Sequence, residues 1–405
     1  MPVVNDVLAL DEYDFPKVRS IGHAPVFAAH GRLIVRPGYD PAAEIHYVES
    51  GLQIARINDR PTADDVESAK GFIEELLFDF PFADEPSRAH AYAALLQPFA
   101  RLIIAAPTPL YLFDSPKQGT GKGLLASVIC IVATGQDAAR IPPVENEQEM
   151  RKQITSVLLE GRQVILIDNV RKALDSPSLA VALTSFTWSD RVLGVSKMAT
   201  IPVEALWMCT GNNIRVQGDM PRRCLRCRLD ARVERPWERG AFRHELPGWA
   251  KEHRSELVES SLILVQHWIV SNRPEGTKIL GGYERWSRTM GGILQCAGIP
   301  GFLDNVSDLY DLADEEGAAW REFIAHWSAE HGPRPVGVSQ LIHLARDLDS
   351  FLPVLGEKGD RSERIRFGYA LSQKVDQIIN GYQIKRGTED HCGRNSYYLV
   401  SMASG

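Results

Sequence analysis

The residues best suited to chemistry form a glycine-rich loop that ends in a lysine. An apolar strand candidate, Leu110–Phe113, runs into this loop, and the helical run Leu124–Val132 follows it. The core of the loop is Gly119–Lys122, which has the sequence GTGK. A turn of small residues between a strand and a helix lets backbone N–H groups and the helix N-terminus surround a phosphate. The lysine ammonium is then expected to contact the outer phosphates of a nucleotide.

The loop follows the pattern of a P-loop with two departures. Pro116 stands at the first glycine position, and Gly123 stands at the Ser/Thr position that normally holds magnesium. An ordinary glycine-rich turn is the alternative, and the types of the flanking strand and helix disfavour it. The residues expected to contact a nucleotide are Pro116, Lys117, Gln118, Gly119, Thr120, Gly121, Lys122, Gly123 and Leu124.

A second chemical signal is an acid at the end of a buried strand. The run Val164–Ile167 is continuously apolar, as in parallel strands covered on both faces, and Asp168 follows it. In P-loop enzymes such a carboxylate holds Mg²⁺, so we expect Asp168 to be a catalytic residue and a metal ligand. Asn169 stands where many such ATPases carry a glutamate, and an amide can orient water but cannot take its proton. Glu149, on the preceding predicted helix, is a candidate base, although a solvated helix face explains it equally well.

A lysine-bearing hairpin is predicted after this strand. Two β-prone arms, Arg191–Val195 and Thr200–Val203, flank a short turn that contains Ser196 and Lys197. If the hairpin faces the pore of a ring, Lys197 is placed to meet a nucleic-acid phosphate. The alternative is a surface hairpin whose lysine only protects a sheet edge from pairing.

Two further polar positions follow the buried run Ala205–Cys209. Asn212 ends a strand expected between those of the loop and of the acid, where it can hydrogen-bond a γ-phosphate or the attacking water, with Asn213 as the neighbour that could be mistaken for it. Arg223, with Arg222 second, is placed to reach the nucleotide of a neighbouring subunit. Guanidinium suits this task because it is permanently charged and offers forked donors to phosphate oxygens.

Composition limits the class of protein. A chain of 405 residues allows about two or three domains. The formal net charge of −7 disfavours a uniformly basic surface, so DNA contacts must come from local basic patches. One C-x-x-C pair, Cys224 and Cys227, has no second pair at zinc-ligand spacing. The sequence shows neither a membrane-spanning apolar segment nor a secretory leader, so we expect a cytoplasmic protein without membrane contact.

The chain divides into regions by its patterning. We expect a small β-rich region over 1–60, a helical collar over 61–106, an ATPase core over 107–248, a helical lid over 249–303 and a winged-helix-like domain over 317–405. The last region combines helices, one of them around Phe367–Ile379, with strand candidates at Tyr382–Lys385 and Ser396–Val400. DNA binding and a protein-protein role are both open for such a module.

The order of these signals resembles that of the AAA+ ATPases, and among them most of all the superfamily III type helicases of phages, plasmids and mobile elements. The resemblance covers about residues 20–310 and is carried mainly by Gly119–Lys122, Val164–Asn169, Trp188–Val195 and Thr210–Cys224. It implies an α/β fold with an AAA+ P-loop (ASCE) core, in which helices flank a parallel sheet. It also implies roles for single residues: Lys122 as Walker A lysine, Asp168 as Walker B acid, Asn212 as sensor 1, Arg223 as trans-acting finger and Lys197 as DNA contact.

The function implied by the resemblance is an ATP-dependent DNA helicase or translocase. We expect ATP and Mg²⁺ as cofactors, single-stranded or forked DNA as substrate, and a homo-oligomer, a hexameric ring, that serves replication of a phage or mobile element. A primase or polymerase is a candidate partner.

Two alternatives remain open. The residues Gly123 and Asn169 favour an ATP-dependent DNA-binding initiator, loader or defence ATPase with slow turnover and no unwinding. A small-molecule kinase that uses the P-loop is the third hypothesis, but such an enzyme has no use for Arg223 directed at a neighbouring subunit.

Overall fold

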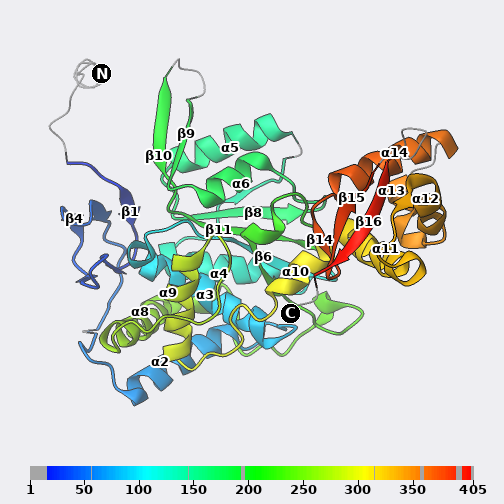
Figure 1. Ribbon diagram of the computed structural model, residues 1–405. Helices are drawn as coiled ribbons and strands as arrows, with labels where there is room; N and C mark the ends of the chain where they lie inside the picture. Colours follow the sequence, from blue (N-terminus) through cyan, green and yellow to red (C-terminus); the bar gives the residue numbers. More distant parts are fainter. Residues whose placement is uncertain are drawn as a thin grey trace. The chain divides into compact units, whose positions relative to one another are not determined.

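The computed structural model of the chain describes residues 16–55, 57–144, 146–192, 197–313, 315–355, 360–388 and 395–402. The chain divides into two compact units, Met1–Leu309 and Tyr310–Gly405. The first unit contains the P-loop and is built around one central sheet (Figure 1).

The central sheet has five parallel strands in the order β12-β6-β11-β8-β7. Its strands are β6 (Leu110–Ser115), β7 (Arg140–Ile141), β8 (Val164–Val170), β11 (Leu206–Asn212) and β12 (Cys224–Arg228). β6 is buried throughout, and β8 and β11 are buried except near their carboxyl ends, because strands of a parallel sheet are covered on both faces. This confirms the predicted α/β core with a parallel sheet, and β11 lies between β6 and β8 as expected.

Helices flank this sheet (Figure 1). The helices of the first unit are α2 (Ala63–Leu77), α3 (Glu85–Ile104), α4 (Lys122–Thr134), α5 (Glu147–Leu159), α6 (Pro177–Thr184), α7 (Gly248–Glu252), α8 (Arg254–Val270) and α9 (Glu284–Cys296), together with the 3-10 turns η1 (Pro221–Arg223) and η2 (Pro236–Glu238). A further helix, α10 (Val306–Ala313), crosses the boundary between the two units. α3 is buried over most of its length, and every residue of α4 from Leu125 to Ala133 is buried. One hydrophobic core joins α2, α3, α4, α8 and α9 to the sheet.

Short strands form the N-terminal part of the first unit. They are β1 (Ser20–Gly22), β2 (Val26–Phe27), β3 (Leu33–Ile34), β4 (Gly38–Asp40) and β5 (Ile45–Tyr47), arranged as the sheets β1-β5-β4 and β2-β3.

The predicted hairpin is present, with different bounds for its first arm. It consists of β9 (Thr187–Arg191) and β10 (Met198–Pro202), which pair antiparallel. The first arm was expected at Arg191–Val195, but α6 ends at Thr184 and Ser185 is already extended, so the β-prone residues that follow enter the strand earlier. Ser196 and the end of the expected arm lie outside the described residues, whereas Lys197 is described and exposed.

The second unit combines helices with a small antiparallel sheet in the order β13-β16-β15-β14. Its elements are α11 (Glu315–His331), β13 (Val336–Gly337), α12 (Val338–Arg346), η3 (Asp349–Phe351), α13 (Leu352–Leu355), α14 (Asp360–Gln373), β14 (Ile378–Ile379), β15 (Tyr382–Arg386) and β16 (Ser396–Ser401). A separate core of aromatic and aliphatic side chains, including Trp320, Phe323 and Phe351, holds the unit together. The helix expected to reach Ile379 ends at Gln373 instead, and a left-handed residue, Asp376, separates it from β14.

Candidate functional site

The P-loop connects β6 to α4 at the carboxyl edge of the central sheet. Gly119 and Gly121 have φ values of +77° and +100°, a region that favours glycine. A Cβ at Gly119 would also lie 2.9 Å from the Cβ of Trp237. α4 begins at Lys122 without a side-chain cap, so its first N–H groups remain available to an anion. The loop geometry is therefore compatible with a phosphate ligand.

The ammonium of Lys122 donates hydrogen bonds to four oxygen atoms of the protein. Its Nζ donates to Ser115 Oγ at 2.5 Å and to Asn212 Oδ1 at 2.7 Å, with longer bonds of 3.3 Å to Lys117 O and Thr120 Oγ1. Burial lowers the pKa of Lys122, while the nearby carboxylates of Asp114 and Asp168 act in the opposite direction. All four bonded oxygens are uncharged, so a phosphate anion would be a stronger partner for this cation than any of them.

The structure distinguishes Asn212, the last residue of β11, from Asn213, which follows the strand. Asn212 Oδ1 accepts from Lys122, whereas Asn213 Oδ1 accepts from Arg228 at 3.1 Å. The Asn213 backbone is left-handed, with φ 45°, and its N–H donates to Ser115 O. Asn212 is thus the residue whose side chain reaches the P-loop lysine.

Asp168 ends the buried part of β8 with both carboxylate oxygens engaged. Thr210 Oγ1, on the neighbouring strand β11, donates to Asp168 Oδ1 at 2.5 Å. Arg140 Nη1, on the edge strand β7, donates to Asp168 Oδ2 at 3.0 Å. Asn169 is exposed and left-handed (φ 67°), and its backbone N–H donates to Thr210 Oγ1 at 2.9 Å. Sequence reasoning did not identify Thr210 or Arg140.

The donors around Asp168 do not fit a preformed magnesium site. Magnesium needs several oxygen ligands in octahedral geometry. Gly123 supplies no hydroxyl, and a Cβ placed there would lie 3.5 Å from Arg140 Nη1. Within the described ranges, no group of three or more His, Cys, Asp or Glu residues could hold a metal ion. A guanidinium therefore stands beside the acid where a cation was expected.

The other expected loop contacts divide into two groups. Pro116 is half-buried, whereas Gln118 and Lys117 are exposed, and Lys117 Nζ donates to Glu234 O at 3.2 Å. Leu124 lines a cavity beside the loop. Glu149 lies on the surface of α5, where its carboxylate accepts a hydrogen bond from Lys152 Nζ at 2.7 Å. Its partner in the structure is thus Lys152 and not Asp168.

The two candidate finger arginines share one acid of their own chain. Arg223 Nη1 donates to the backbone oxygen of Asp219 at 2.8 Å and lies 3.2 Å from Asp219 Oδ2. Arg222 also pairs with Asp219. The side chain of Arg222 is 57% exposed and that of Arg223 only 16%. Exposure therefore favours Arg222 as the arginine that meets another molecule.

The base of the hairpin is fixed to α5. Asp190, on β9, accepts from Arg151 Nη2 and from Thr155 Oγ1, both at 2.7 Å. Trp188 Nε1 donates to the same threonine hydroxyl at 2.9 Å. Lys197, at the far end of the described strands, is exposed. The hairpin thus presents a lysine to solvent from an anchored base.

An aromatic cavity beside the P-loop was not predicted. It has a volume of about 560 Å³ and is lined by Gly119, Gly121 and Leu124 on one side. The lining also includes the aromatic residues Phe80, Trp237, Phe242 and His244. The segment that brings three of them, residues 236–246, is largely irregular and has no apolar periodicity in the sequence. A planar base attached to phosphates in the P-loop would find aromatic partners here.

The sequence analysis also did not predict an ion-paired cluster around Asp114, on the strand that precedes the P-loop. Asp114, on β6, is almost fully buried and accepts from Arg226 Nη2 at 2.7 Å and Arg228 Nη1 at 2.5 Å. Its other oxygen accepts from the Ile214 backbone N–H at 3.0 Å. The cluster ties the strand before the P-loop to β12 and to the segment after Asn212, so it supports the position of both.

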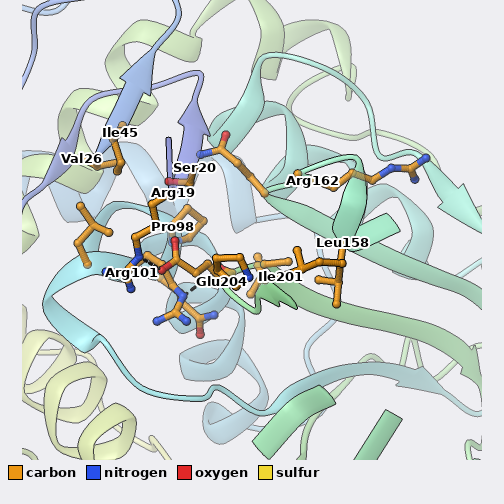
Figure 2. Close-up of a pocket in the computed structure, with 17 residues that line it drawn as sticks. Arg19, Ser20, Val26, Ile45, Pro98, Arg101, Leu158, Arg162, Ile201 and Glu204 are labelled. Carbon is orange, nitrogen blue, oxygen red and sulfur yellow. Dashed lines mark hydrogen bonds and ion pairs between the residues drawn. The ribbon is translucent and has the colours of Figure 1, made fainter. Parts of the chain in front are cut away.

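A second cavity lies at the opposite edge of the sheet (Figure 2). It measures about 90 Å³ and adjoins the starts of β8 and β11. The guanidinium of Arg101 donates hydrogen bonds there to the backbone oxygens of Glu204, Val203 and Ala106, at 2.9 to 3.0 Å. Because these donors already have protein partners, we interpret this cavity as a packing feature between α3 and the connection from β10 to β11.

Comparison with known proteins shows distant similarities only. The sequence matches no protein-family model and no curated protein. Among solved structures, the A form apo structure of the NrS-1 C-terminal region is 10% identical, with a TM-score of 0.43, and the similarity covers 90% of this chain and 84% of that one. The SCCmec type IV Cch active helicase is 11% identical, with a TM-score of 0.33 and coverage of 99% and 81%. JCV helicase is 13% identical, with a TM-score of 0.26 and coverage of 62% and 73%. These scores are low, so the functional argument rests on the geometry of the site. Among the described residues, no helix is both long and apolar enough to span a membrane.

Proposed function

We propose that this chain is a P-loop ATPase that moves on DNA, a helicase or translocase. The observation that carries the proposal is that Lys122 joins two strand ends, those of β6 and β11, while the end of β8 carries Asp168. Lys122 Nζ donates to Asn212 Oδ1, on β11, at 2.7 Å. Thr210, also on β11, donates to Asp168 on the neighbouring strand β8. This arrangement supports ATP as the ligand, with its phosphates at Lys122 and the N-terminus of α4 and its base in the aromatic cavity.

The DNA-directed part of the proposal rests on the exposed Lys197. A lysine at the end of an anchored hairpin can contact a phosphate of single-stranded DNA without any base-specific contact. The exposed Arg222, with Arg223 beside it, supports nucleotide sites shared between subunits of a ring, for which we propose a hexamer. The helices and antiparallel strands of the second unit are compatible with a winged-helix module, which we propose as a DNA- or protein-binding part.

A second candidate is a nucleotide-dependent DNA-binding protein with slow turnover, such as an initiator, loader or defence ATPase. The Arg140–Asp168 pair and the exposed amide of Asn169 favour this candidate, because neither supplies a base for the attacking water. Replication of a phage or mobile element, with a primase or polymerase as partner, is the setting that we propose for either function.

ATP hydrolysis with and without single-stranded DNA tests the proposal directly. A motor is expected to hydrolyse ATP faster when DNA is present and to displace the strand of a forked substrate. Binding of the fork without displacement would assign the second function instead. If ATP is neither bound nor hydrolysed, both candidates are wrong.

Replacing Phe242 with alanine is expected to weaken ATP binding about tenfold and to leave binding of inorganic tripolyphosphate unchanged. The reason is that stacking of a base on an aromatic ring contributes about 1–3 kcal/mol, and tripolyphosphate has no base. Competition against a fluorescent ATP analogue measures both affinities. Phe186→Ala, at an exposed phenylalanine outside this cavity, is the matched control. Equal weakening for both ligands would argue against a base in the cavity.

Replacing Lys197 with alanine is expected to reduce the salt dependence of DNA binding. Loss of one phosphate contact lowers the slope of log affinity against log salt by about one for each bound subunit. ATP hydrolysis without DNA is expected to remain unchanged, since Lys197 lies on the hairpin. Titration of labelled single-stranded DNA at several salt concentrations measures the slope, with Lys70→Ala on α2 as control. An unchanged slope would assign the lysine to the protection of a sheet edge.

A further inference from the structure

An arginine occupies the neighbourhood of the P-loop in which a metal ion was expected. Arg140 Nη1 lies 3.0 Å from Asp168 Oδ2, and Arg140 Nη2 lies 3.2 Å from Ser127 Oγ. Ser127 is on α4, slightly more than one turn after Gly123, at the helix that begins with the P-loop lysine. The guanidinium therefore bridges the acid of β8 and the helix of the P-loop.

Position 123 carries no side chain beside this guanidinium. A Cβ at Gly123 would lie 3.5 Å from Arg140 Nη1 and 3.9 Å from Nη2, which are ordinary contact distances. A serine or threonine hydroxyl, one bond farther out, would share this neighbourhood with the guanidinium. Glycine at 123 and arginine at 140 are thus two parts of one local arrangement, although 17 positions separate them in the chain.

The charge and the donors of Arg140 suit a phosphate ligand. A guanidinium has five N–H donors, and the hydrogen bonds to Asp168 and Ser127 use two of them. The side chain is 47% exposed, so other donors remain accessible from solvent. Lys122 lies at the start of the same helix and supplies a second positive charge. Two cations, Lys122 at the start of α4 and Arg140 beside Ser127 of the same helix, are therefore available to a polyphosphate.

We infer that Arg140 supplies the positive charge that magnesium supplies beside the hydroxyl of other P-loops, and that this site binds the triphosphate of a nucleotide without a divalent cation. The inference rests on the proposed nucleotide site and specifies its ligand as metal-free nucleoside triphosphate. Forked guanidinium donors match phosphate oxygens in geometry and remain charged at every physiological pH. Asp168 then acts as a positioning residue for Arg140.

Equilibrium binding of a fluorescent ATP analogue in EDTA and in magnesium tests the inference. The wild-type chain is expected to bind with affinities that agree within about threefold in the two conditions. Arg140→Met, which keeps the length of the side chain without its charge, is expected to bind about tenfold or more weakly in EDTA, because a charged hydrogen bond to phosphate is lost. Arg140→Lys is expected to fall between the two.

A double variant distinguishes the loss of the Arg140 contact from a folding defect, because it is expected to retain binding in one of the two conditions. Gly123→Ser combined with Arg140→Met frees Asp168 and adds a hydroxyl, so this double variant is expected to bind in magnesium and to lose binding in EDTA. Arg32→Met breaks an Arg–Asp pair of 2.7 Å with comparable exposure in the N-terminal strands and is expected to behave as wild type.

Three results have distinct meanings. If the wild type needs magnesium for binding, or if Arg140→Met binds as tightly as the wild type in EDTA, the inference about Arg140 is wrong and the nucleotide site stands. If the wild type binds the analogue in neither condition, the proposed nucleotide site itself is wrong. Agreement of the wild-type affinities, together with the loss in Arg140→Met, supports the inference.

Discussion

Lys122→Ala is expected to weaken ATP binding by about a hundredfold or more and to abolish hydrolysis. The ammonium is buried at the start of α4 and contacts four oxygens of the protein, which phosphate oxygens are expected to replace. Charged hydrogen bonds contribute about 1.5–3 kcal/mol each, and two of them account for this loss. Fluorescence titration gives the affinity, and phosphate release gives the rate.

Lys117→Ala is the matched control for this variant. Lys117 belongs to the same loop, but its side chain is exposed and its Nζ donates to Glu234 O. Its replacement is expected to change ATP affinity by less than about threefold, in line with the small contribution of exposed charges. Retention of wild-type affinity in Lys122→Ala would mean that phosphates do not bind in this loop.

Asp114→Ala is expected to lower the free energy of unfolding of the first unit by about 3 kcal/mol. The carboxylate is almost fully buried, and its loss leaves the guanidinium groups of Arg226 and Arg228 without their common partner. Removal of one member of a buried ion pair costs about 3–5 kcal/mol, and the partial exposure of the two arginines reduces that cost. Urea denaturation of the wild type and the variant measures the difference.

Two comparisons sharpen this prediction. Asp114→Asn keeps an acceptor for the Ile214 N–H and is expected to lie between the wild type and the alanine variant. Glu238→Ala breaks an exposed pair with Arg235 and is expected to cost less than about 0.5 kcal/mol. A loss in Asp114→Ala no larger than in Glu238→Ala would show that the cluster contributes little to stability.

The sequence predicted those site residues that follow strands. Asp168 directly follows an apolar run of strand length, Asn212 comes three residues after another, and Lys122 ends the loop after a third. Parallel strands end at one edge of a sheet. Their convergence is therefore a property of the sheet. The position of β11 between β6 and β8 was expected from the resemblance to P-loop ATPases, because apolar runs alone do not encode strand order.

Arg140 could not be identified in this way. It lies in a strand of two residues at the edge of the sheet, and its contact with Asp168 depends on the pairing of β7 with β8. Neither a motif nor a spacing encodes such a cross-strand contact. Once β7 is known to pair with β8, however, a long basic side chain in β7 can be predicted to reach Asp168.

The aromatic cavity escaped prediction for another physical reason. Apolar residues are located by a period of two in strands or 3.6 in helices. Trp237, Phe242 and His244 lie in a segment with only one short 3-10 turn, so no period assigns them to a face. These three residues line one cavity with Phe80 and the P-loop glycines because of the path that the irregular segment follows, which no sequence period encodes.

The contact between Asn212 and Lys122 has a consequence for every affinity measured on this chain. In the free protein the lysine is already solvated by protein oxygens, among them the asparagine amide at 2.7 Å. An incoming phosphate must exchange places with these internal ligands, so the observed binding constant reports the difference between two sets of contacts and not the strength of either set. Shortening the amide side chain would remove one competitor, and slower release of the nucleotide would accompany tighter binding.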